Sequence, residues 1–522
     1  MKAKRLRYTW ISALMLILLP AGAAFAQKTG SSASVWSRIE QGDFRPGFSS
    51  SSIWRMGAEA HTDGIFNSGK TFLSGSFSFE EMHGKDMMTS IFINPGYYPI
   101  DVLEFTPGDK KLQTYRFSGG IRHEVASDWR IGGSIDYATQ NYSKQKDIRH
   151  TNYALDLTLK PSVYWNAVFG QMALSGVFRK TSESIEAEQV GAATADSYMA
   201  FFDKGLRYGT MQSWDGAGIH LAEAGVNRLP VREFSFGAAG QFSRRDVTID
   251  AEYLRTRGSV GEKGYDWYRF PGHKVAANLR WNRYWRSLHT VLTVHFGWMG
   301  QALEESVLDK VNSGGVTLPT VYGWNLVSRR RQADFVPMLV IDFRGRAFRA
   351  LTLGYVGIIK DEQASPSYPY TDTWHAALHR VHGTASLGLP FGRVWRRFDL
   401  GLGAKALWGS DRSQGLEPGD PTDKPWGDGT AISGSPSAGG DTPSFHGLSV
   451  ESQPTRLLSD WVRKREYMLA SALELNGSIR YRFDAVPGLC LSADAAWLHA
   501  YSIEYLLGKN RLTATLRLSY YF

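Results

Sequence analysis

The chain contains 522 residues with 59 Lys or Arg and 50 Asp or Glu, which gives a formal net charge of +9. Four of the positive charges fall within the first 26 residues, so the remainder is too mildly basic to indicate a nucleic-acid-binding protein. The one cysteine, Cys490, excludes an internal disulfide, and the sequence contains no phosphate-binding loop or zinc-finger spacing.

The N-terminal residues have the organisation of a secretory signal peptide. Basic residues between Lys2 and Arg7 precede a short apolar run over 10–19, and Ala24 and Ala26 are the small residues that a signal peptidase reads. The apolar run is too short to cross about 30 Å of hydrocarbon as a helix. We therefore predict export and removal of residues 1–26 by cleavage after Ala26.

Residues 27–51 contain many Ser, Gly and Pro residues. We expect them to form an N-terminal periplasmic segment or a small plug, and we assign residues 52–522 to the main domain. Beyond the signal, no stretch of about 18 consecutive apolar residues exists, which excludes helical membrane spans.

From residue 52 onward, apolar and polar residues alternate over long segments. In 111–123, for example, Phe117 and Ile121 alternate with Arg116 and Arg122. Successive side chains of a strand point to opposite faces, so each segment has one apolar and one polar face. The segments are longer than the typical 5–6 residues of strands in soluble sheets, and a sheet that spans lipid must close on itself to satisfy its backbone.

The alternation predicts an all-β, transmembrane antiparallel β-barrel of about 18 strands, with 16 or 14 as alternatives if the weakest segments are loops. The predicted strands are 52–61, 71–82, 86–94, 111–124, 128–141, 151–166, 169–181, 232–244, 246–256, 274–284, 287–299, 333–345, 348–358, 380–390, 396–408, 467–483, 487–501 and 511–522.

The connections between these segments broadly alternate between short and long. Bacterial barrels have short periplasmic turns and long extracellular loops, so we expect the long connections to be extracellular. Two of them contain possible helices, near 185–204 and near 302–311. A third, 409–466, is rich in Gly, Ser, Pro and Asp.

The last segment has apolar or aromatic residues at every second position, namely Leu516, Leu518, Tyr520 and Phe522. This pattern resembles the C-terminal assembly signal of Gram-negative outer-membrane β-barrel proteins. The chain is similar to an outer-membrane barrel family of Bacteroidota that has no assigned role. The resemblance implies location in the cell outer membrane, contact with its lipid, and recognition by the barrel-assembly machinery.

The polar faces of the predicted strands carry charges, which we assign to the lining of the lumen. These predicted lumen residues are Arg116, Arg122, Arg130, Asp136, Asp156, Arg280, Glu474, Arg480, Arg482, Asp494 and Arg517. Two interpretations stay open: a water-filled pore whose charges set selectivity, and a lumen filled by Arg–carboxylate pairs.

No catalytic, cofactor or metal site is predicted. His375, His379 and His382 lie before or at a strand, where a solvated loop is favoured over metal binding. No nucleophile motif is found. The favoured function is a non-enzymatic channel or transporter for small solutes. The alternatives are a scaffold that binds a surface lipoprotein or secretion partner through loops 182–231 and 409–466, and an outer-membrane hydrolase; a homo-oligomer is also open.

Overall fold

The computed structural model describes residues 27–522 apart from several gaps, so the predicted signal peptide lies outside the described residues. The gaps are 46–49, 51, 67–68, 147, 189–198, 207, 216–217, 220–227, 263–264, 314–315, 344–346, 368–369, 390–396, 415–451 and 502.

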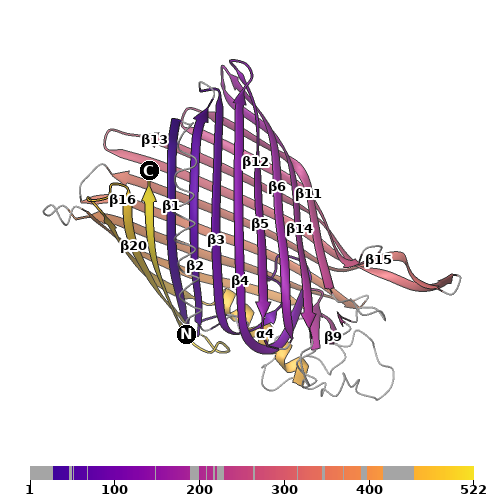
Figure 1. Cartoon of the computed structure of the whole chain (residues 1–522). Helices are drawn as coiled ribbons and strands as arrows, with labels where there is room; N and C mark the ends of the chain where they lie inside the picture. The colour runs from indigo at the N-terminus through magenta and orange to yellow at the C-terminus, as the bar shows by residue number, and fades with distance from the viewer. Residues whose placement is uncertain are drawn as a thin grey trace, which may run out of the picture.

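The described chain forms a closed antiparallel barrel of eighteen strands, because each strand pairs with its neighbour and the first pairs with the last (Figure 1). The all-β barrel prediction and its strand number are therefore confirmed. The barrel strands are β1 (Gln27–Gly42), β2 (Ser52–Phe66), β3 (Thr71–Ser90), β4 (Asp101–Glu124), β5 (Trp129–Lys144), β6 (Arg149–Ala167), β7 (Gly170–Glu188), β11 (Arg228–Arg244), β12 (Val247–Glu262), β13 (Tyr265–Tyr284), β14 (Leu288–Ser313), β15 (Val316–Phe343), β16 (Phe348–Ser367), β17 (Tyr370–Gly388), β18 (Phe398–Gln414), β19 (Ala472–Arg482), β20 (Leu489–Ala500) and β21 (Asn510–Tyr521).

The assignment of 27–51 to a periplasmic segment or plug is wrong for most of its length. Residues 27–42 form β1, which pairs with β2 on one side and with β21 on the other. Val35 and Ile39 alternate with Arg38 and Glu40, but the many serines weaken this pattern. Strand β1 therefore closes the barrel.

A second error in the predicted strands offsets the missed strand β1, so the predicted strand number stays correct. Segments 71–82 and 86–94 were predicted as two strands, whereas residues 71–90 form the single strand β3. The apparent turn near Gly84 is a bulge, because the β3–β4 register shifts there and Asp86 and Thr89 have φ values of 53° and 79°. Extra residues in a bulge bend a strand without ending it.

The two ends of the barrel differ. At one end, here called the turn end, short connections such as 125–128 and 245–246 join the strands, and β21 ends beside the start of β1. At the opposite end, the loop end, lie the β3–β4 connection and the long insertions 189–227 and 415–471. Several predicted loops at this end are instead strand extensions, most clearly in the β14–β15 hairpin that projects beyond the wall (Figure 1).

Apolar side chains cover the outside of the barrel. On β4, Phe117 and Ile121 are 49% and 50% exposed, whereas Arg116 and Arg122 lie on the opposite face. An apolar exterior on a closed barrel is the arrangement that spans lipid. No helix in the described part of the chain has both the length and the apolar character of a membrane span.

The buried apolar residues gather inside the barrel at the loop end. The inserted elements there are β8 (Met199–Asp203), β9 (Gly209–Asp215), β10 (Gly218–Ile219) and α4 (Ser452–Leu469). The predicted helix near 185–204 is not found in its described residues, which belong to β7 and β8, and 302–311 belongs to β14. The apolar residues that suggested these helices extend the sheet or fill the lumen.

Candidate functional site

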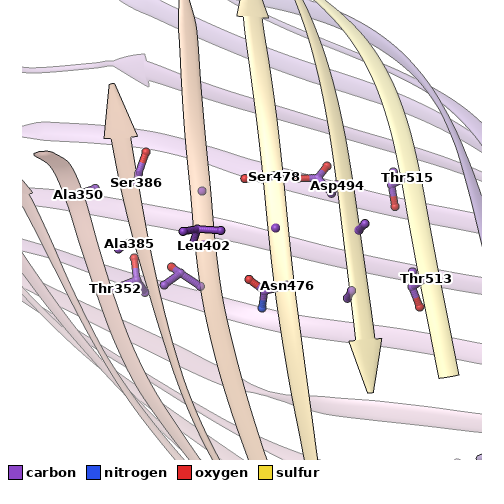
Figure 2. A pocket seen from close by; sticks show the side chains of 15 residues that line it. Ala350, Thr352, Ala385, Ser386, Leu402, Asn476, Ser478, Asp494, Thr513 and Thr515 are labelled. Carbon is purple, nitrogen blue, oxygen red and sulfur yellow. The ribbon is translucent and has the colours of Figure 1, made fainter. Parts of the chain in front are cut away.

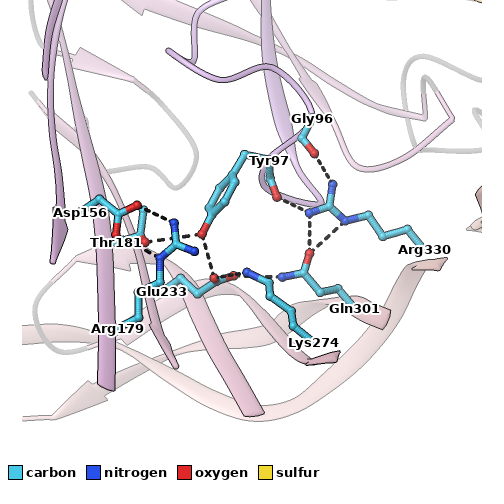
Figure 3. Close-up of polar contacts among 9 residues, drawn as sticks. All are labelled: Gly96, Tyr97, Asp156, Arg179, Thr181, Glu233, Lys274, Gln301 and Arg330. Carbon is cyan, nitrogen blue, oxygen red and sulfur yellow. Dashed lines mark hydrogen bonds and ion pairs between the residues drawn. The ribbon is translucent and has the colours of Figure 1, made fainter. Parts of the chain in front are cut away.

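The β3–β4 connection, residues 91–100, crosses the lumen. In the order around the barrel β3 is third and β15 is twelfth of eighteen, so the two strands are diametrically opposite. Nevertheless Arg330 on β15 donates hydrogen bonds to the carbonyls of Gly96 (2.6 Å), Tyr98 (2.9 Å) and Tyr97 (Figure 3). The connection is therefore held on the far wall by one guanidinium group.

A buried carboxylate extends this attachment. Glu233 on β11 accepts hydrogen bonds from the Tyr97 hydroxyl (3.0 Å), Lys274 Nζ (2.6 Å) and Gln301 Nε2 (2.9 Å), and Gln301 in turn accepts one from Arg330 Nε (3.0 Å). Figure 3 shows Tyr97 of the connection meeting side chains of β11, β13, β14 and β15. Because Glu233 is only 1% exposed, each donor offsets the cost of its burial.

Strand β8 joins the same inner layer by pairing with the start of β4. Beside this pairing, Glu104 is buried between Lys110 (Nζ–Oε1 3.0 Å) and Lys144. Burial also raises the pKa of the Tyr98 phenol above its ordinary value, so the ring packs as a neutral group. We call residues 91–103 together with β8 and β9 the first half of the cap.

Helix α4 is the second half of the cap. Arg465 donates to Asp411 on β18 (Nη2–Oδ1 2.8 Å), and this hydrogen bond is the main cause of a raised pKa for the guanidinium group. Trp374 Nε1 donates to the same carboxylate (2.8 Å), and its ring contacts Trp461 edge-on with centroids 5.3 Å apart. Glu466 accepts the backbone N–H groups of residues 505 and 506. The helix is thus attached to the wall and to the β20–β21 connection.

A narrow space, here called the seam, separates the two halves of the cap. Its hollows, each about 80 Å³, are lined by Arg330, Lys360, Glu362, Trp461 and Lys464 among others. Three of these side chains are cationic and one is anionic. The Trp461 indole N–H is buried and has no described hydrogen-bond acceptor. Asp101 and Asp203 also line the second hollow, so the seam presents hydrogen-bond donors and charges of both signs.

Beneath α4 lies a larger cavity of about 330 Å³ with a cationic lining. Arg38, Arg380, Lys405 and Arg511 face Glu474, which Lys405 contacts at 2.9 Å. No carboxylate in the described residues lies within ion-pair distance of Arg380. This cavity therefore carries an excess of positive charge.

Farther toward the turn end, a basin of about 410 Å³ is formed by strands β16 to β21 (Figure 2). Hydroxyl and amide side chains such as Thr352, Asn476, Ser478 and Thr515 line it, and Asp494 is its only ionisable residue. Gly401 leaves room for the Ser478 hydroxyl, because a Cβ there would lie 2.2 Å from Ser478 Oγ. The basin is polar and nearly uncharged.

These spaces follow one another along the barrel. The seam and the cationic cavity share Met468, and the cationic cavity shares Ala496 and Thr513 with the basin. Along β16 their lining runs from Lys360 through Val356 to Thr352. Met468 of α4 therefore lies between the seam and the cationic cavity.

Several predicted lumen residues form ion pairs with neighbouring strands or, for Arg517 on β21 and Glu59 on β2, across the intervening strand β1. These pairs are Asp156 with Arg179 (3.0 Å), Glu474 with Lys405 (2.9 Å), Arg517 with Glu59 (2.5 Å), Arg130 with Glu124 (3.9 Å) and Arg482 with Asp399. Part of the charge on the polar face is thus compensated locally.

The remaining predicted residues are distributed along the same face. The Arg122 guanidinium lies over the rings of Phe72 and Tyr164, and Asp494 lines the basin. Register places Arg116 opposite Ala138 and Asp136 opposite Thr158; Arg280 is opposite Thr293 and Arg480 opposite Ser492. The structure does not gather the eleven residues into one cluster, and their role in lining a water path stays a prediction.

The three histidines lie on strand β17 and have different partners, so they do not form one group. His375 pairs with Asp361 (3.3 Å) and His379 bonds the Tyr355 hydroxyl (2.8 Å), whereas the His382 ring lies at Gly354. Within the described residues no group of three or more His, Cys, Asp or Glu side chains is placed to hold a metal ion.

Cys490 is a buried free thiol. At the end of β21, Leu516 and Leu518 are 54% and 41% exposed on the outer wall. Their recognition by assembly machinery, together with Tyr520 and Phe522, stays a prediction.

Sequence reasoning missed the residues that close the lumen. Arg330 lies within the run Arg329–Arg331, whose middle residue faces inward, but 300–332 was interpreted as a loop. Helix α4 was divided between a loop and a strand, although Trp461, Arg465 and Met468 recur at helical spacing. That spacing was the available signal.

Solved structures with a similar fold include two receptors and one iron transporter. A mutant of the ferric enterobactin receptor PfeA from Pseudomonas aeruginosa is 8% identical, with a TM-score of 0.41, 95% of this chain and 81% of that chain covered. The FrpB iron transporter from Neisseria meningitidis is 8% identical with a TM-score of 0.42, and the match covers 95% of this chain and 82% of that chain. The alcaligin outer-membrane receptor FauA from Bordetella pertussis is 9% identical with a TM-score of 0.38, and the match covers 96% of this chain and 77% of that chain.

No curated protein matches the sequence. A protein-family model described as a family of unknown function, DUF6850, matches residues 20–522 and thus the whole barrel. The chain therefore belongs to the DUF6850 family.

Proposed function

We propose that this protein is an outer-membrane barrel that passes small anionic solutes through its lumen. The observation that carries the proposal is the succession of seam, cationic cavity and basin along the barrel, joined by shared lining residues. Its larger spaces have the volumes of small-molecule sites. The cap halves fill the loop end, so passage requires the seam to widen at Met468.

The charge of the cationic cavity supports anions over cations. In the cavity Arg38, Arg380, Lys405 and Arg511 face Glu474. At the seam Lys360 and Lys464 are opposed by Glu362, Asp101 and Asp203, so the positive charge of the path lies in the cavity. Rings of positive side chains favour anions in pores because they lower the electrostatic cost of entry.

Solute flux into proteoliposomes tests this proposal. Wild-type protein should admit a small organic anion faster than a cation of equal size. The double variant Arg380→Gln with Lys405→Gln should lose most of that preference, because it removes charge from the cavity without closing it. Arg269→Gln is the matched control, since Arg269 faces outward and pairs with Glu304.

Two results would contradict the proposal. One is flux equal to that of protein-free liposomes for the wild type and for the cap variant Arg330→Gln. The other is an unchanged anion preference in the cavity variant.

A partner-binding scaffold is a second candidate, supported by the β14–β15 hairpin that projects beyond the wall (Figure 1). A scaffold that acts through this hairpin predicts a stoichiometric surface lipoprotein, or a second copy of the chain, in detergent extracts. Shortening the hairpin by removal of 308–319 should release that partner and leave solute flux unchanged. Retention of the partner by the shortened chain would contradict this function.

A further inference from the structure

Four arginines form a basic surface on the outer wall of the barrel. Arg255 and Arg257 on β12, and Arg329 and Arg331 on β15, are all exposed. The residue between the first two, Thr256, is fully buried on the inner face. Strand alternation therefore directs these four guanidinium groups away from the lumen.

Strand pairing places the four arginines in two rows that include a hollow. They form two rows across the sheet, one of Arg255, His273, Gly300 and Arg331 and the other of Arg257, Pro271, Ala302 and Arg329. Because Gly300 and Ala302 on strand β14 are small, a depression of about 430 Å³ lies over β13 to β15, lined by Arg329, Arg331 and Trp298 among others. Arg255 and Arg257 continue the two rows one strand beyond it.

The hollow lies at one edge of the apolar band. Arg331 is twelve positions along β15 from Phe343, which belongs to the aromatic residues of the turn end. At about 3.3 Å per residue and a tilt of about 40°, twelve positions rise about 30 Å, close to the apolar height of outer-membrane barrels. Toward the turn end, the outer wall continues with the apolar side chains of Phe296, Phe335 and Ile359.

None of the four arginines has an ion-pair partner among the described carboxylates. Their neighbours differ in this respect, since Arg269 pairs with Glu304 and Asp361 pairs with His375 (3.3 Å). Unpaired guanidinium groups beside lipid are costly unless phosphates accept their hydrogen bonds. The geometry fits an anionic partner that also has an apolar part.

We propose that this outward basic surface binds the phosphorylated saccharide headgroup of a glycolipid in the outer membrane leaflet. The phosphates lie among the four guanidinium groups, a sugar ring occupies the depression over Gly300, and the acyl chains extend along Phe296 and Phe335. This inference rests on the outer-membrane location given under the proposed function, but it concerns the outer wall and not the lumen.

The test is native mass spectrometry of the full-length mature protein in detergent with hexa-acylated, bis-phosphorylated lipid A as the probe. Wild-type protein should retain the lipid. The quadruple variant Arg255→Gln, Arg257→Gln, Arg329→Gln and Arg331→Gln should bind the lipid at least about tenfold more weakly. The reason is that each basic residue near an anionic lipid surface contributes to affinity. The double variant Arg329→Gln with Arg331→Gln should show an intermediate loss and is the milder change if folding suffers.

The control is Arg283→Gln with Arg286→Gln, which removes two positive charges from the turn end. It should retain the lipid as the wild type does. Dephosphorylated lipid A should bind weakly, and millimolar inorganic phosphate should not displace the lipid. Any of three results would overturn the proposal. The folded double variant Arg329→Gln with Arg331→Gln retains the lipid as well as the wild type does. Dephosphorylated lipid A binds as well as the phosphorylated form, or inorganic phosphate displaces the lipid. Because no flux is measured, failure here is distinct from failure of the transport function.

Discussion

At the scale of single residues, Arg330 and Arg331 show how one step along a strand separates two environments. Arg330 points inward and binds three carbonyls of the connection that crosses the lumen, whereas Arg331 is exposed on the outer wall. The rule of alternate faces predicts such a separation. It does not predict the contact of Arg330 with residues 96–98, because that contact joins opposite walls.

Glu233 offers a residue-scale test of the cap. Glu233→Gln should lower the free energy of unfolding by about 1–3 kcal/mol, since Lys274 keeps its charge in a buried site without its carboxylate partner. Urea unfolding of the protein in lipid or detergent measures this loss.

Glu304→Gln is the matched control for that measurement. It breaks the exposed contact with Arg269, which should contribute less than about 1 kcal/mol. Equal losses in the two variants would show that Glu233 does not hold the cap.

At the scale of elements, the sequence predicts the wall strands well, but it predicts poorly which elements close the barrel and its lumen. Alternation located most wall strands, because a face in contact with lipid must be apolar at every second position. It overlooked β1, where Ser31, Ser32, Ser34 and Ser37 replace larger residues, and it divided β3 at a bulge. It also missed α4, whose partners Asp411 and Trp374 lie on other strands.

The role of β1 gives an element-scale prediction. Deletion of residues 27–42 should prevent folding, because β2 and β21 would each expose an unpaired edge to lipid. Heat-modifiable migration in gel electrophoresis reports the folded barrel. Removal of 308–319, at the projecting end of the β14–β15 hairpin, is the control and should leave a folded barrel. A deletion of β1 that still folds would support a plug instead of a closing strand.

At the scale of the whole molecule, the fold combines a wall that the sequence predicts with an interior that depends on contacts between distant residues. The predicted lumen residues lie on strands, where local alternation fixes their face. The cap is assembled from the β3–β4 connection, the insertion 189–227 and α4, so its position follows from tertiary packing. The proposed path is therefore controlled by the elements that the sequence revealed least.

Conductance of the full-length mature protein in planar lipid bilayers tests the capped lumen most directly. The variant Arg330→Gln with Arg465→Gln releases both halves of the cap, and Arg269→Gln is the control. We expect small or infrequent openings for wild type and control, and sustained anion-selective openings for the released variant. Equal conductance of the wild type and the released variant, whether both are open or both are sealed, would contradict the account.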